Sequence, residues 1–248
     1  MTEHIRLPLA LLFCGLLAHG AACANAAKYK TNMPPSAELS YAIKAKQKGI
    51  PLEGDSVMRW TQDGSRFNAS NEARAILIGK ILDARSEGVI DAYGLAPASF
   101  TEKRFRKQAV TTSFDRTAGA IRFTASEQTY PIKGGEQDRN SVIWELVAVA
   151  RAAPAKAKPG TAWNFVVAGV RDAEPWIFKV VKQDKIRTPL GELNALHITR
   201  VPQPDSQEQH VDIWLAPSLE WYPVRVRYSE DDGDYIEQTL RAINRQSP

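Results

Sequence analysis

The stretch from residue 136 to residue 154, EQDRNSVIWELVAVARAAP, is the one long helical pattern in a chain that otherwise reads as β-strands. Asp138 is a suitable N-cap for it, and Pro154 ends it. A helix that is apolar around most of its circumference has to be covered on several sides, so we expect a helix at about 138–153 enclosed by sheet. Its large apolar side chains recur at steps of one, three and four residues: Val142, Ile143, Trp144, Leu146, Val147 and Val149.

The segments on both sides of this helix alternate apolar and polar residues. Leu39, Tyr41 and Ile43 share one face of an extended segment, and turn signals such as Asp63-Gly64 recur about every 8 to 12 residues. Residues 66–83 fit either one extended strand or a strand followed by a helix, and we favour the strand because hairpin signals flank it. The sequence therefore predicts a mainly β fold, a curved antiparallel meander that is half-barrel-like and wraps around the one central helix, with about seven strands before it and about six after it.

Residues 1–26 have the features of a secretory signal. An apolar run from Leu7 to about Ala18 is too short to span a bilayer, and small residues follow it up to Ala24-Asn25-Ala26. We expect cleavage after about Ala26, a periplasmic location and no transmembrane segment in the mature chain. The alternatives are a retained membrane anchor and a lipoprotein attached through Cys23. The remainder divides into a flexible leader at 27–35 and a single β-rich domain at 36–248.

Cysteine use and charge narrow the function classes. Both cysteines, Cys14 and Cys23, lie in the signal, so the mature chain has no disulfide and no thiolate nucleophile. The formal net charge is +4, and removal of Glu3 and Arg6 with the signal leaves it unchanged. A balance this mild does not indicate nucleic acid as a partner.

The sequence provides no strong catalytic or metal-binding motif. The patterns of a nucleophile elbow, a zinc protease, a P-loop and a dinucleotide fold are all absent. His197 and His210 lie on strands joined by one connection, but two imidazoles without a third ligand are weak evidence for a metal, and the acidic run 230–234 reads first as a hairpin. We therefore expect no enzyme, no metal and no cofactor, while a hydrolase with two carboxyl groups in one cleft remains a third hypothesis.

Four motifs in order resemble a known family, from about Pro34 to Ile243. Together they are similar to the bacterial exported family known only as domain of unknown function 3108, which implies an envelope or periplasmic location and no established activity. A looser similarity in fold is to periplasmic lipoprotein carriers, whose curved sheet wraps helices and holds acyl chains, but a fold does not transmit function by itself. The motifs are Met33-Pro34-Pro35-Ser36-Ala37-Glu38-Leu39-Ser40-Tyr41, Tyr93-Gly94-Leu95-Ala96-Pro97 with Phe100, Gly135-Glu136-Gln137-Asp138-Arg139-Asn140-Ser141-Val142, and Trp214-Leu215-Ala216-Pro217 with Tyr222-Pro223-Val224-Arg225.

Polar residues at the expected start of the helix form one candidate site. Gln137, Asp138 and Arg139 lie where free backbone N–H groups and the helix dipole can receive an anion. The carboxylate of Asp138 can occupy that position itself, so we favour helix capping and an Arg139 ion pair over a ligand.

Two pairs of arginines form a second candidate site. In the basic run 103–107, Arg104 and Arg106 share one face if the run is a strand, and Arg225 and Arg227 alternate with valines in the same way. Such a row can grip phosphate or carboxylate groups, and the alternative, which we favour, is a solvated or edge-protecting strand face.

The leading hypothesis is a non-catalytic carrier that binds a lipid or a similar amphipathic envelope molecule in a groove beside Trp144 and Leu146. The alternative is an envelope structural or assembly protein that binds another protein through a sheet face or edge. An open apolar cavity next to the helix supports the first, and a filled interior with an exposed apolar patch supports the second.

Overall fold

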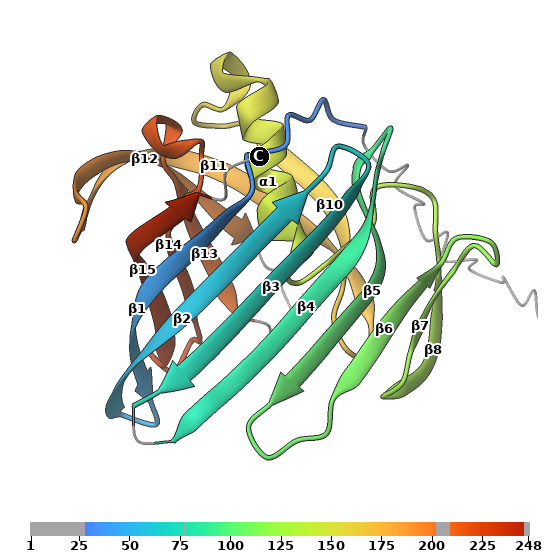
Figure 1. Cartoon of the computed structure of the whole chain (residues 1–248), viewed down its shortest axis with the longest axis horizontal. Coiled ribbons are helices and arrows are strands. Elements are labelled where there is room, and N and C mark those ends of the chain that lie inside the picture. Colours follow the sequence, from blue (N-terminus) through green and yellow to red (C-terminus); the bar gives the residue numbers. More distant parts are fainter. Residues whose placement is uncertain (1–27, 77, 202–208, 246–248) are drawn as a thin grey trace, which may run out of the picture.

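The computed structural model describes residues 28–76, 78–201 and 209–245, so the expected signal at 1–26 lies outside the described residues. Within them the chain forms one 15-stranded sheet that curves around a single α-helix (Figure 1). The prediction of a mainly β, half-barrel-like meander around a central helix is confirmed. The sheet stays open, because its two outermost strands do not pair with each other.

The first eight strands of the chain form a meander of consecutive hairpins. Inward positions alternate with outward ones along each strand, as in β1, where Leu39, Tyr41 and Ile43 are buried. The eight strands are β1 (Ala37–Gln47), β2 (Ile50–Gln62), β3 (Arg66–Ala75), β4 (Gly79–Asp91), β5 (Gly94–Arg104), β6 (Val110–Asp115), β7 (Ala120–Phe123) and β8 (Ser126–Pro131).

The strands after the helix form a second meander that joins the first through antiparallel pairing of β1 with β15. The short β9, which directly precedes the helix, pairs in parallel with β10 and forms the outer edge of this half of the sheet. The bounds are β9 (Gln137–Asp138), β10 (Ala162–Ala168), β11 (Ala173–Thr188), β12 (Gly191–Val201), β13 (His210–Leu215), β14 (Pro223–Ser229) and β15 (Tyr235–Arg245), with the 3₁₀ turns η1 (Pro154–Lys156) and η2 (Pro217–Leu219).

The helix α1 spans Ser141–Ala152, and every residue from Ser141 to Ala150 is buried. Trp144 stacks on Trp60 of β2 with ring centroids 5.0 Å apart, which holds the helix against the first meander. Burial on all sides is what the apolar pattern predicted.

The predicted helix start at 138 is wrong by three residues. Asp138 belongs to β9, where its extended backbone pairs with Ala168, and Asn140 occupies the N-cap position. The Asp138 carboxylate nevertheless receives the backbone N–H groups of Asn140 and Ser141, both at 2.8 Å. The Asp138 side chain therefore caps the helix, although the residue itself lies two positions before the N-cap residue Asn140.

Two features of the first meander differ from expectation. Residues 66–83 form parts of two paired strands, β3 and β4, because the chain reverses between Ala75 and Gly79, which has φ +83°. Pro97, a residue type that is unusual inside a sheet, lies inside β5, opposite Gly88 and next to a bulge. A proline fits there because the chain pairs with β6 only from Ser99 onward.

The described part of the leader expected at 27–35 has no regular secondary structure, yet its backbone is hydrogen-bonded to the core. The N–H of Asn32 donates to the carbonyl of Ala148 at 3.0 Å, and the carbonyl of Pro34 accepts from the indole of Trp60 at 3.0 Å. This segment therefore covers part of α1.

Candidate ligand cavity

A cavity of about 240 Å³ lies between the N-terminal end of α1 and the inner faces of both meanders. Strands β1, β3, β4 and β5 line one side, and β11 to β15 line the other. The helix contributes Val142 and Ile143. Because inward positions recur at every second residue of a strand, each strand supplies side chains to the same wall.

Most of the lining is apolar. Phe100 and Phe178 are almost fully buried, while Leu82 on β4 is partly exposed. Such a surface suits an apolar chain or ring. The other apolar lining residues are Ile43, Ala73, Ile81, Ala84, Trp176, Val211, Ile213 and Ile236, with the phenol of Tyr228.

Three arginines bring positive charge to this apolar space, namely Arg104, Arg139 and Arg200. Among the described residues that line the cavity, Glu102 is the sole carboxylate. It accepts a hydrogen bond from Arg104 at 2.6 Å. The lining therefore contains more guanidinium groups than carboxylates, and each guanidinium offers several N–H donors to a polar ligand group.

Arg200 is held at the second-meander side of the cavity. Its guanidinium is almost completely buried, donates to the Glu174 carboxylate at 2.7 Å and to the carbonyl of Gln209 at 3.3 Å, and stacks over the ring of Trp176 at 4.0 Å. Buried arginine with a carboxylate and an aromatic partner is rigid. These partners therefore fix the position of Arg200, and Glu174 offsets much of its charge.

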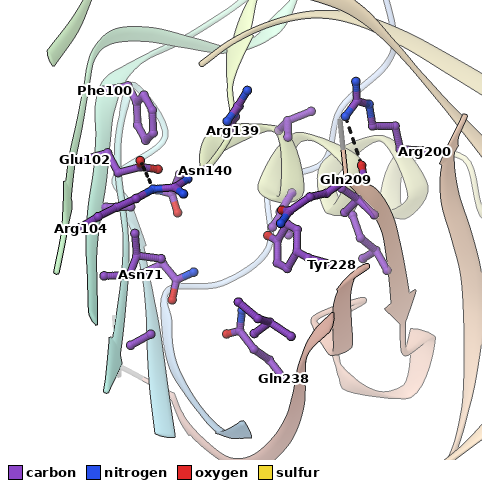
Figure 2. Close-up of a pocket in the computed structure, with 18 of the residues that line it drawn as sticks. Asn71, Phe100, Glu102, Arg104, Arg139, Asn140, Arg200, Gln209, Tyr228 and Gln238 are labelled. Carbon is purple, nitrogen blue, oxygen red and sulfur yellow. Dashed lines mark hydrogen bonds and ion pairs between the residues drawn. The ribbon is translucent and has the colours of Figure 1, made fainter. Parts of the chain in front are cut away.

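Tyr228 lies across the cavity from Glu102 and Arg104 (Figure 2). Burial raises the pKa of its phenol to about 12, against the opposing effect of Arg139. Glu102 raises the pKa further and Arg104 lowers it. The phenol therefore stays protonated and is available as a hydrogen-bond donor at neutral pH.

One buried polar atom in the lining has no hydrogen bond within the described part of the chain. The Oδ1 atom of Asn71 is buried and accepts none, although the side chain lies on the cavity wall. Figure 2 shows its amide directed into the space between the two walls. An unsatisfied buried acceptor is uncommon and costs free energy, so it suits a site that receives a polar group.

The cavity reaches the surface beside Arg104 and Gln209, both of which are exposed. Arg104 has a side chain that is 61% exposed even though it also lines the cavity. A ligand held here can therefore keep a charged end near water while its apolar part is buried.

Behind the cavity, the residues at the start of the helix form a buried polar network. Gln137 donates to the carbonyl of Leu95 at 2.6 Å and accepts from Ser141 at 2.9 Å. Asp138 accepts from Ser86 at 2.6 Å, and burial raises its pKa to about 6 despite these bonds. The Asp138 carboxyl thus accepts from the first N–H groups of the helix, and of the predicted triplet 137–139 only Arg139 lines the cavity.

Trp144 and Leu146 pack into the core and do not line the cavity. Trp144 lies between Trp60 and Tyr222, with its ring centroid 6.3 Å from that of Tyr222. The helix therefore turns Val142 and Ile143 toward the cavity instead.

The two predicted arginine pairs do not form one site. Arg104 ends β5, and Arg106 lies in the following turn with φ +57°, so the two do not share a strand face. Arg225 and Arg227 do share a face of β14, but both pair with Glu237 on β15, at 3.6 and 3.2 Å. Of the four arginines, only Arg104 reaches the cavity.

The two histidines do not form a metal site. His197 contacts Asp212 at 2.7 Å and stacks on Trp214, whereas His210 lies 3.4 Å from Asp231. No cluster of three or more metal-ligating side chains occurs in the described ranges. None of the helices in these ranges is long and apolar enough to cross a membrane.

Sequence reasoning missed Asn71, Glu102, Arg200 and Tyr228. A signal for two of them was present: Arg200 is in phase with the inward Leu196 and Ile198, and Glu102 is in phase with Phe100. A charged residue at an inward position of a strand indicates either a buried ion pair or a site.

The comparisons with known proteins identify a family and a fold. The family described as "Protein of unknown function (DUF3108)" matches residues 38–241. No curated protein matches the chain. A crystal structure described as a beta-barrel-like protein of domain of unknown function DUF1849 from Brucella abortus is similar with a TM-score of 0.59 and 13% identity, over 88% of this chain and 100% of that chain. This similarity shows the fold alone.

A weaker match is a proposed outer membrane lipoprotein-sorting protein domain from Vibrio parahaemolyticus. Its TM-score is 0.32 at 7% identity, over 86% of each chain, which is too low to support a conclusion.

Proposed function

Since the chain belongs to the DUF3108 family, whose description assigns no activity, we propose its function from the cavity: it is a non-catalytic protein that binds an amphipathic ligand such as a lipid. The observation that supports this is the combination of an apolar interior with an arginine that is both exposed and in the lining, Arg104. The apolar part of the ligand lies against Phe100, Val142 and Ile143. Its polar end lies toward Arg104 and Asn71.

The cavity size limits the ligand. At about 240 Å³ the space is slightly smaller than the roughly 300 to 1,000 Å³ typical of small-molecule sites. One apolar chain or a compact amphiphile fits this volume better than a lipid with several long chains. The guanidinium of Arg104 at the exposed mouth favours an anionic polar end, because it has several N–H donors and its hydrogen bond to Glu102 uses one of them.

We also propose that the protein acts in the periplasm after cleavage near Ala26. The apolar run and the small residues at 24–26 support export. A lipid-binding role fits that compartment, because acyl chains that leave a membrane need an apolar enclosure.

Native mass spectrometry of the chain, expressed with its own signal and released gently from the periplasm, tests both proposals. The expected spectrum has a chain that begins at Ala27 and carries an extra mass, which disappears on denaturation and is recovered in an organic extract. A mass that retains residues 1–26 would contradict the cleavage.

A substitution that fills the cavity makes the test specific. Ala73→Phe on β3 places a ring into the cavity and should remove the extra mass, whereas Val57→Phe on the outward side of β2 should keep it. Thermal melts of both variants establish that they are folded. A clean mass for the wild-type chain, or an extra mass that survives Ala73→Phe, would refute the cavity as the site, and pull-downs would then test the alternative of an envelope protein partner.

A further inference from the structure

Four of the large apolar residues most exposed to solvent gather in three turns at one end of the first meander. Ile50 is 61% exposed, Ile76 69%, Ile78 44% and Phe105 42%. Ile50 lies beside the β1–β2 turn, Ile76 and Ile78 lie in the β3–β4 turn, and Phe105 lies in the β5–β6 turn. We call these four residues the apolar rim.

The turns that carry the apolar rim are neighbours in space. A meander reverses at every turn, so every second turn lies at the same end of the sheet, as Figure 1 shows at its lower edge. The N–H of Ile76 donates to the carbonyl of Glu53 at 3.1 Å, and the N–H of Phe105 donates to the carbonyl of Ile81 at 2.9 Å. These two bonds tie the three turns into one continuous edge.

Basic side chains flank the apolar rim in the β1–β2 and β5–β6 turns. Within the described ranges no carboxylate forms an ion pair with the charged side-chain end of the exposed Lys103, Arg106, Lys107, Lys46 or Lys48. The guanidinium of Arg106 lies over the ring of Phe105 at 4.9 Å. Exposed apolar tips flanked by unpaired lysines have the composition that binds the surface of an anionic bilayer.

Acidic groups near this end set the orientation. Lys80 and Arg74 are paired with Glu72, so the β3–β4 turn is nearly balanced in charge. The β14–β15 turn is acidic, because it contains Glu230, Asp231 and Asp232. It adjoins the β1–β2 turn: its Asp234 carboxylate accepts from the N–H of Lys48 at 2.6 Å. An anionic surface therefore attracts the β5–β6 side and repels the β14–β15 side.

We propose that the apolar rim and its flanking lysines dock this protein on an anionic lipid bilayer. Ile76, Ile78 and Phe105 enter the headgroup region, while Lys103 and Lys107 contact lipid phosphates. A bilayer is a better occupant than a protein, because the tips project separately from three turns and exposed basic side chains flank them.

The docking edge adjoins the mouth of the cavity. Ile81 and Arg104 line the cavity and lie next to the β3–β4 and β5–β6 turns. Docking by the rim thus places the cavity mouth at the bilayer surface, although docking itself does not require a ligand in the cavity. The two proposals can therefore fail independently.

Vesicle cosedimentation of the exported chain tests the docking. Wild-type protein should bind vesicles of phosphatidylcholine with one third phosphatidylglycerol, and bind phosphatidylcholine alone at least tenfold more weakly. Raising the salt from about 0.1 M to about 1 M shortens the screening length from about 10 Å to about 3 Å and should weaken binding to the anionic vesicles.

Two rim variants and two matched controls separate the apolar and basic contributions. Ile76→Ser with Ile78→Ser, and separately Lys103→Gln with Lys107→Gln, should each lower the partition coefficient at least tenfold. Leu190→Ser alters an apolar residue that is 45% exposed in the β11–β12 turn, and Lys156→Gln with Lys158→Gln alters two exposed lysines after α1; both controls should bind like wild type. All the substituted side chains are exposed, so the variants should keep the wild-type melting temperature.

Three outcomes would overturn the docking proposal. One is wild-type protein that does not bind anionic vesicles, and another is equal binding by the rim variants and the controls. The third is a rim variant that changes the oligomeric state in light scattering while vesicle binding is unchanged, which would assign the rim to contacts between copies of the chain. Loss of vesicle binding with retention of the extra mass in native mass spectrometry would leave the cavity function intact.

Discussion

Glu145 provides a sharp test of how the helix is buried. Its side chain lies in the middle of α1 and is completely enclosed. Its Oε2 atom accepts from the N–H of Leu95 at 2.8 Å, and its Oε1 atom has no hydrogen bond within the described part of the chain. Burial, with a smaller contribution from Asp91, raises its pKa from 4.5 to about 8. The folded protein therefore holds Glu145 as the neutral acid at pH 7.

The raised pKa links folding to pH with a definite sign. Below about pH 4.5 both the folded and the unfolded chain hold the proton, and the carboxyl has no effect. Above that, the unfolded chain ionises and the folded chain does not, so the free energy of unfolding falls by about 1.4 kcal/mol per pH unit until about pH 8. Between about pH 5 and about pH 8 the loss from this one group amounts to about 3 to 4 kcal/mol, because the slope levels off near each of the two pKa values.

Glu145→Gln removes this dependence while keeping the shape and the acceptor for Leu95. Near pH 5 the variant should match wild type, and near pH 8 it should be more stable by about 3 to 4 kcal/mol. Urea unfolding at several pH values measures both chains, and their difference cancels every other titrating group, including Asp138. Glu127→Gln, at an exposed position, is the control and should track wild type throughout. Parallel pH profiles for wild type and Glu145→Gln would refute the argument.

Three further predictions concern the same core. Trp144→Ala should lower the free energy of unfolding by about 3 to 5 kcal/mol, since it removes the ring stacked on Trp60, and a loss under about 1 kcal/mol in a chemical melt would contradict the central helix. Gly94→Ala should cost at least about 2 kcal/mol, because Gly94 has φ +105° and a Cβ there would lie 2.3 Å from Glu145; unfolding that matches wild type would show that the helix can move away. Asp138→Ala should cost about 2 to 4 kcal/mol through the two N–H groups it leaves unpaired, whereas Asp138→Asn keeps an acceptor and should cost less than half as much in the same melts.

The cavity mouth and the apolar rim are close together in the structure. The cavity mouth at Arg104 and the exposed tips at Ile76 and Phe105 lie at the same end of the first meander. Under the two proposals, a ligand that moves between a bilayer and the cavity crosses a short distance without exposing its apolar part to water.

Strand periodicity and turn chemistry predicted much of the fold, because both are local. Inward positions such as Leu39 and Ile198 follow from alternation, and hairpins follow from pairs such as Asp63-Gly64. The misses are also local in origin. Strand β8 (SEQTYP) has no apolar alternation, and the reversal after Ala75 contains no residue pair typical of a turn before Gly79.

The candidate site was largely beyond prediction, because its residues come from distant strands. Asn71 and Tyr228 line one cavity although they lie on different meanders, and the pairing of β1 with β15 is what brings those meanders into one curved sheet. Pairing between segments so far apart depends on the register of the whole sheet, which no short pattern encodes.

The sequence alone determined that α1 had to be enclosed, since an apolar circumference cannot face water, and that strands would enclose it. The tertiary structure decided which side of the helix borders open space. Trp144 is held between Trp60 and Tyr222, and this packing sets the rotation of the helix and turns Val142 and Ile143 toward the cavity. The protonation of Glu145 was decided in the same way, because a carboxyl loses its charge only when the surrounding sheet removes water from it.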